Sequence, residues 1–129
     1  MTISIKSRKA KARSLQNLIA KKIAEITGRP FGKDMEIQGR EMGQSGEDVK
    51  LYGKALELFP FSIEAKNSEK WDVHSAIKQA KGNTKDGLDW LCVFKRNRED
   101  PVVMMCMSTF FRIYNTYLRM QEMLNKEIK

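Results

Sequence analysis

Two charged residues near the end of one predicted strand are the side chains of this sequence best suited to chemistry. The stretch 59–67, FPFSIEAKN, alternates apolar and polar residues, which is typical of a strand with one buried face. Glu64 and Lys66 both fall on the polar face and therefore lie side by side. Either they form a surface ion pair, which would contribute little to stability, or they belong to a catalytic site.

A second carboxylate is expected to lie beside this pair. Asp48, in SGEDVKL, begins the preceding predicted strand, so it can approach Glu64 across two neighbouring strands. Two carboxylates offer the hard oxygen ligands that Mg²⁺ binds, and Mn²⁺ can substitute for it. The cation would polarise a phosphate and lower the pKa of a bound water. Lys66 would orient that water or stabilise charge on the phosphate.

The charge of the chain favours a polyanionic partner. The 129 residues include 24 Lys or Arg and 16 Asp or Glu, which gives a net charge of +8. Much of the excess lies in a predicted basic N-terminal arm, about residues 1–13, and a second basic group follows a predicted strand in FKRNR. These groups either keep the protein soluble or bind nucleic-acid phosphates. The predicted phosphate contacts are Lys9, Lys11, Arg13, Lys95, Arg96 and Arg98.

The segments that must position these residues follow from periodicity and from Gly and Pro. A helix is predicted from an N-cap at Ser14 to about Gly28, followed by a long Gly-rich loop over 29–47. Strands are predicted at 48–51, 58–66, 88–95 and 102–107, and helices at 71–81 and from about 108 to the C-terminus. This order, α-β-β-α-β-β-α, predicts a single α/β domain over 1–129, with a small mixed sheet flanked by helices.

Other features of the sequence limit the class of protein. No apolar run approaches the roughly 20 residues that cross a bilayer, and the N-terminus lacks a secretory h-region, so a cytoplasmic protein with no membrane partner is expected. Cys92 and Cys106 fall in predicted strands and are expected to be buried free thiols. With His74 as the single histidine and no CxxC pair, a zinc site is not predicted.

The spacing of Asp48 and Glu64-Ala65-Lys66 resembles the signature of the PD-(D/E)XK nuclease superfamily. Taken together, GQSGEDVKL, ALELFPFSIEAKN, KWDVHSAIKQA and FKRN are similar to a group of phage-encoded, Holliday-junction-resolvase-like endonucleases. The resemblance extends from the basic first helix to the fourth predicted strand. It departs from the superfamily pattern at Glu47, which stands where the literal proline would precede the aspartate.

The resemblance implies a restriction-endonuclease-like fold and assigns roles to residues. It makes Asp48 and Glu64 the metal-binding carboxylates, adds the backbone carbonyl of Ala65 to the metal shell, and makes Lys66 the catalytic lysine. Two further positions match places where some members carry active-site side chains, although both residues could instead be solvated surface residues. These positions are Glu25, late in the first helix, and Gln79, in IKQAK.

The resemblance also implies a substrate and an assembly. The implied substrate is branched duplex DNA, cut symmetrically by a homodimer in the cytoplasm of a bacterial host if the protein is phage-encoded, with no small-molecule cofactor beyond the metal. The apolar C-terminal helix either helps to build that dimer or closes the core of the monomer. Two alternatives remain for the function, namely a non-catalytic nucleic-acid-binding protein and a repair or flap nuclease with the same metal chemistry.

Overall fold

One mixed sheet forms the centre of the domain. The structure, a computed structural model, describes residues 4–39 and 46–128. Its strands lie in the spatial order β1-β2-β3-β4-β5, and all neighbours are antiparallel except β3 and β4, which are parallel. The strands are β1 (Ile37–Gly39), β2 (Val49–Leu51), β3 (Phe61–Asn67), β4 (Asp89–Lys95) and β5 (Val102–Met105).

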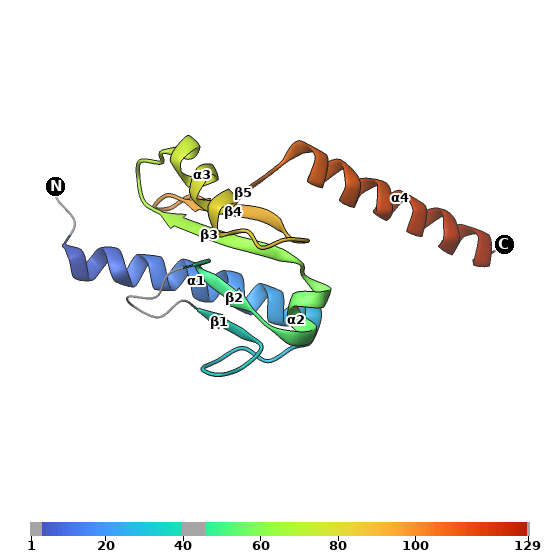
Figure 1. The fold of residues 1–129 in the computed structure, drawn as a ribbon, viewed down its shortest axis with the longest axis horizontal. Coiled ribbons are helices and arrows are strands. Elements are labelled where there is room, and N and C mark those ends of the chain that lie inside the picture. Colours follow the sequence, from blue (N-terminus) through green and yellow to red (C-terminus); the bar gives the residue numbers. More distant parts are fainter. Residues whose placement is uncertain (1–3, 40–45, 129) are drawn as a thin grey trace.

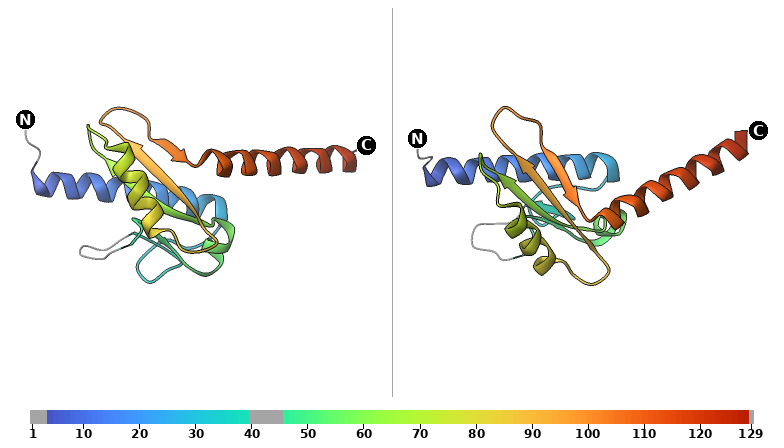
Figure 2. Two further views of the ribbon diagram at one scale, coloured as in Figure 1. Left: turned by 45° about the horizontal axis from the view of Figure 1, so that its top comes forward. Right: turned by 90° about the horizontal axis from the view of Figure 1, so that it is seen from above.

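Two helices cover opposite faces of this sheet, and a third protrudes from it (Figure 1). The first, α1, packs on one face, whereas α3, which connects the parallel strands β3 and β4, packs on the other. The short α2 joins β2 to β3, and α4 extends away from the domain in all views (Figure 2). The helices are α1 (Ile5–Thr27), α2 (Gly53–Leu58), α3 (Val73–Asn83) and α4 (Met107–Ile128).

The alternation of side chains along β3 divides the interior into two cores. Ile63 points into the core under α1, whereas Glu64 is fully buried on the opposite face, which α3 covers. The sequence correctly assigned the apolar side chains of this strand to a core. It was wrong to expect that the polar face lies at the surface, because α3 buries that face as well.

The predicted fold class, a single α/β domain with a mixed sheet flanked by helices, is confirmed. The predicted order of elements missed β1 and α2, so the observed order is α-β-β-α-β-α-β-β-α. The three residues of β1 lie inside the predicted loop 29–47 and pair with β2, Ile37 opposite Leu51. The six residues of α2 begin at Gly53, whose φ of 55° lies in the left-handed region that glycine adopts without a steric penalty.

The first helix begins earlier than predicted, at Ile5 instead of Ser14. Ser4 is its N-cap, with the Ser4 hydroxyl accepting a hydrogen bond from the Ser7 backbone N–H at 3.2 Å. The basic N-terminal arm is therefore mainly helical over its described residues. Alternating Lys, Arg and Ala residues have high helix propensity, and this propensity extends the helix beyond its apolar stripe.

The cysteines differ from each other in their surroundings. Cys92 lies in β4 and is buried, as predicted, but Cys106 follows the end of β5 and is exposed, so the prediction was wrong for Cys106. Neither forms a disulfide. Nothing in the helical part of the described chain combines the length and the apolar character that crossing a membrane requires.

The C-terminal helix does not close the core of the monomer. Its first two turns are attached to the start of β4, where the Thr109 hydroxyl donates to Asp89 Oδ1 at 3.2 Å and Arg112 forms an ion pair with the same carboxylate. Beyond these turns the helix extends away from the domain (Figures 1 and 2). Of the two interpretations of this helix, closure of the core is therefore excluded.

Candidate active site

The two carboxylates predicted to act together do meet, on the α3 face of the sheet. Asp48 directly precedes β2, and its backbone N–H donates to the Ile63 carbonyl at 2.8 Å. Its Oδ2 accepts a hydrogen bond from the Ala65 N–H at 2.7 Å. Because Val49 pairs with Ile63 on the α1 face, the alternation along both strands directs Asp48 and Glu64 to the other face.

Glu64 is a fully buried acid with half of its carboxylate unsatisfied. Its Oε1 accepts a hydrogen bond from Asn83 Nδ2 at 2.7 Å, but its buried Oε2 has no hydrogen-bond partner among the described residues. Burial, next the nearby charge of Asp48, and also the close contact of the two carboxylates, which becomes a hydrogen bond only when they share a proton, raise the pKa of Glu64 to about 7. The hydrogen bond from Asn83 and the charge of Lys66 oppose this rise. The site therefore favours a positive charge or a proton at Glu64.

Lys66 stands two residues further along β3, on the same face and closer to solvent. Its Nζ donates to Gln79 Oε1 at 3.0 Å, which joins β3 to α3 at the rim of the site. The structure thus brings Gln79, one of the predicted site residues, to Lys66. A surface ion pair between Glu64 and Lys66 is excluded, because Glu64 is 0% exposed.

Glu25 lies apart from this group. It is on α1, which packs on the other face of the sheet from Glu64. Its side chain is 70% exposed and its carboxylate faces Lys22 at 3.6 Å. In this structure Glu25 is a surface residue of a helix end, and the sheet separates it from Asp48 and Glu64.

Asn83 is a site residue that the sequence analysis missed. The predicted helix ended at residue 81, but Asn83 is the last residue of α3, and its Nδ2 donates to Glu64 Oε1. The Ser62 hydroxyl, on the same face of β3, donates to the Asn83 carbonyl at 3.4 Å. One signal was available, because Asn83 follows Gln79 by four residues and so shares its side of the helix.

Replacing Asn83 with Ala is expected to lower the free energy of unfolding at pH 8 by about 1–3 kcal/mol, because loss of its side-chain N–H leaves both Glu64 oxygens without a donor. Urea denaturation measures this effect. The matched control is Asn97→Ala in the exposed turn after β4, and equal behaviour of the two variants would contradict the role of Asn83.

The predicted phosphate contacts lie in two places. The turn between β4 and β5 carries exposed Arg96 and Arg98, with Lys95 partly buried before them, and the Arg96 guanidinium stacks on Trp71 at 4.6 Å. On α1, Lys9 and Arg13 are exposed. The neighbouring Lys11 is partly buried, and its carbonyl accepts from Asn67 Nδ2 at 2.9 Å, one residue beyond Lys66. The N-terminal half of α1 therefore lies against the same end of β3 that carries Lys66.

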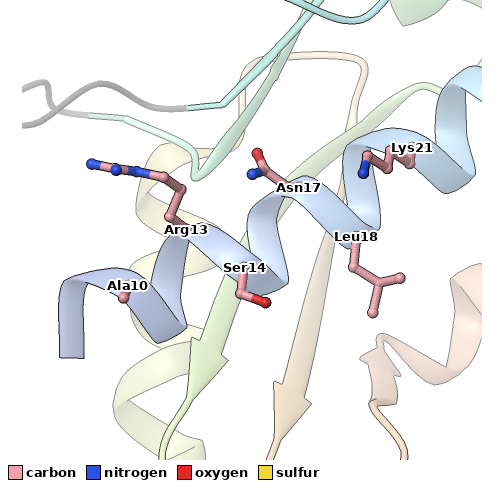
Figure 3. A pocket seen from close by; sticks show the side chains of 6 residues that line it. All are labelled: Ala10, Arg13, Ser14, Asn17, Leu18 and Lys21. Atoms are coloured by element: carbon pink, nitrogen blue, oxygen red, sulfur yellow. The ribbon is translucent and has the colours of Figure 1, made fainter. Parts of the chain in front are cut away.

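A shallow hollow of about 550 Å³ runs along this part of α1 (Figure 3). Arg13 and Asn17 point to the same side of the helix in that view. Basic and amide side chains along an open hollow can bind an extended phosphate backbone. The lining residues are Ala10, Arg13, Ser14, Asn17, Leu18 and Lys21.

The residues at Asp48 and Glu64 fit a divalent cation. Within residues 4–39 and 46–128, no group of three or more His, Cys, Asp and Glu side chains is arranged to bind a metal, so the protein would supply two carboxylates and a backbone carbonyl. Hard oxygen donors of this kind suit Mg²⁺, which usually keeps several waters. The buried, unsatisfied Glu64 Oε2 is the atom that a cation would satisfy.

Searches with this chain against protein-family models, curated proteins and solved structures gave no match.

Proposed function

We propose that this protein is a metal-dependent deoxyribonuclease that hydrolyses phosphodiester bonds at the site formed by Asp48, Glu64 and Lys66. The observation that carries the proposal is Glu64 Oε2, a buried carboxylate oxygen without a hydrogen-bond partner among the described residues. A second carboxylate lies beside it and raises its pKa further. A buried carboxylate beside a second one destabilises the fold unless a proton or a cation neutralises it. Two acids beside a lysine fit the binding of a cation.

Asp48, Glu64 and the Ala65 carbonyl are the groups that would hold Mg²⁺, or Mn²⁺ in its place. When bound, the cation polarises the phosphate and lowers the pKa of a water. The Ala65 N–H holds the Asp48 carboxylate at 2.7 Å, and Asn83 holds Glu64, so both ligands are oriented before substrate arrives.

Lys66 would stabilise the negative charge that develops on the phosphate, or orient the attacking water. Its amine is held at the rim of the site by Gln79, which keeps it near the carboxylates without an ion pair to Glu64. A positioned cation acts most strongly on charge that appears in the transition state. Gln79 is therefore a positioning residue for Lys66 in this proposal.

The finer fold assignment, a restriction-endonuclease-like domain, is part of the same proposal. Two features support it, namely acids on adjacent antiparallel strands and a parallel pair, β3 and β4, connected by α3. We further propose branched duplex DNA as the substrate, cut symmetrically by a homodimer, and a cytoplasmic site of action. The excess of basic residues and the exposed Arg96 and Arg98 support a DNA partner.

The proposal is tested by incubating the purified protein with labelled four-way junction, linear duplex and single-stranded DNA, each in Mg²⁺ or EDTA. Cleavage of the junction in Mg²⁺ but not in EDTA is the expected result. Cleavage of all three DNAs would retain the metal chemistry and reject the preference for branched DNA. Tight binding without cleavage in either Mg²⁺ or Mn²⁺ would reject the nuclease and favour a nucleic-acid-binding protein.

Replacing Lys66 with Ala is expected to lower kcat by about 100-fold while changing the Kd for DNA less than threefold. The reason is that Lys66 acts on charge that is present only in the transition state. Single-turnover cleavage and a binding titration separate the two quantities. Lys78→Ala, on the exposed surface of α3 beside Gln79, removes the same charge away from the site and should leave kcat unchanged. A Lys66→Ala variant that loses binding but keeps kcat would contradict this role.

A further inference from the structure

The helix α4 carries an apolar face that nothing in the described part of the chain covers. Its large apolar side chains are between 43% and 73% exposed, although they make up much of the helix. Several of their rings contact one another along the helix, such as Phe110 with Phe111 and Tyr114 with Tyr117. Nine of these side chains form one face, namely Met107, Phe110, Phe111, Ile113, Tyr114, Tyr117, Leu118, Met120 and Leu124, whereas Met123 lies about 20° around the helix from Arg112 and so on the other side.

The attachment of α4 to its own domain directs this face outward. The helix is held by Thr109 and Arg112, which both bind Asp89. At about 100° per residue, Arg112 lies roughly 160° around the helix from Phe110, so the side that faces the domain is the polar one. Folding the apolar face back onto the domain would require breaking both contacts to Asp89. In both views of Figure 2, α4 starts at the end of β5 and points away from the rest of the domain.

The exposed area of this face is comparable to the area that one partner buries in a stable protein–protein interface. Nine large side chains, each about half exposed, leave on the order of 1,000 Å² of mainly apolar surface. The largest patch on an ordinary monomer is roughly 300–600 Å², and a standard interface buries about 800 Å² on each partner. An exposed apolar patch of this size on a soluble protein marks an interaction site.

The spacing along the centre of the face indicates another helix as the occupant. Met107, Phe110, Tyr114, Tyr117, position 121 and Leu124 follow the alternating three- and four-residue steps of a coiled-coil seam. The one polar residue in this seam, Gln121, donates from Nε2 to the Tyr117 hydroxyl at 2.7 Å. A single polar side chain in a seam is a known device for fixing the register of two helices.

The charges on α4 make a second copy a better occupant than DNA or an anionic membrane. Basic and acidic residues on its polar side nearly balance, in contrast to the strongly basic α1. We propose that two copies of this chain associate through the apolar faces of α4, helix against helix. The charged residues of this polar side are Arg112, Arg119, Glu122, Lys126 and Glu127.

This inference goes beyond the proposed chemistry, and its readout is mass, so it stands or fails separately from DNA cleavage. If both proposals hold, the helices join two nuclease domains, which provides the two sites that symmetrical cleavage of a junction needs.

The experiment measures molar mass by light scattering and by sedimentation for the wild type and two matched variants. Tyr114→Glu/Tyr117→Glu places two charges in the seam, whereas Asn115→Glu/Thr116→Glu places the same charges on the polar side of the same turn. The wild type and the polar-side variant should be dimers at micromolar concentration, and the seam variant a monomer with association at least 100-fold weaker. Urea denaturation should show the domain intact in all three.

Two results would overturn the proposal. They are a monomeric wild type and a dimer that the seam variant leaves unchanged. A monomeric wild type that also sediments with vesicles of anionic phospholipid would assign the apolar face to a membrane surface instead. If the first seam variant aggregates, Tyr117→Lys/Leu124→Lys tests the same face with the opposite charge.

Discussion

Replacing Glu64 with Gln is expected to abolish cleavage, with a loss of at least about 1,000-fold in rate, or about 4 kcal/mol. The substitution removes one negative ligand but almost preserves the shape of the side chain. The Gln carbonyl oxygen can still accept from Asn83, and its amide can donate to Asp48, so the fold should be unaffected. Single-turnover cleavage in Mg²⁺ measures the loss, and a gel-shift titration should show DNA binding within threefold of the wild type.

The control for this variant is Glu57→Gln. Glu57 is an acid on α2 whose side chain is 72% exposed and pairs with Lys54 at 3.7 Å, so the same chemical change there should leave the rate unaltered. Asp48→Asn should behave like Glu64→Gln, because a single carboxylate leaves the cation too few ligands. A Glu64→Gln protein that cleaves within tenfold of the wild type would contradict the assignment of the metal site.

The second large effect concerns stability and pH in EDTA. Burial and Asp48 raise the pKa of Glu64 from 4.5 to about 7, so between these values the folded protein holds a proton that the unfolded chain has lost. The free energy of unfolding of the wild type should therefore fall as pH rises from about 5 to 8, by roughly 3 kcal/mol. Below pH 4.5 this loss of stability is absent, because Glu64 is protonated in both the folded and the unfolded state.

Glu64→Gln isolates this effect, since it removes the titrating group and little else. The difference in the free energy of unfolding between the variant and the wild type, measured in urea from pH 5 to pH 8, should grow with pH in favour of the variant. Adding Mg²⁺ at pH 8 should recover stability in the wild type and not in the variant, because a cation replaces the missing proton. A difference that is constant with pH would show that folding does not raise the pKa of Glu64, and so would contradict this prediction.

Part of the site could be predicted because it depends on local pattern. The alternation in FPFSIEAKN places Glu64 and Lys66 on one face, and the order of the strands brings Asp48 next to them. The burial of Glu64 could not be predicted in this way. It depends on α3 folding over the polar face of β3, which is a long-range contact without a local signal. The role of Asn83 follows from the same contact.

For the fold as well, features with a clear local pattern could be predicted, and features that depend on long-range contacts or on very few residues could not. Long elements with clear periodicity, such as α3 and β4, were predicted to within about two residues at most ends, whereas β1 and α2 were missed because three or six residues carry too little pattern. The residues of α4 predicted a helix correctly. Only the contacts of Thr109 and Arg112 with Asp89 show that its apolar face points away from the domain.

The most direct test of the metal site is X-ray diffraction from crystals soaked in Mn²⁺, recorded where manganese scatters anomalously. The account predicts an anomalous peak bounded by the carboxylates of Asp48 and Glu64 and the carbonyl of Ala65, with ligand distances of roughly 2.0–2.4 Å. Peaks confined to exposed acids such as Glu57, with a water hydrogen-bonded to Glu64 Oε2 in place of a cation, would contradict it.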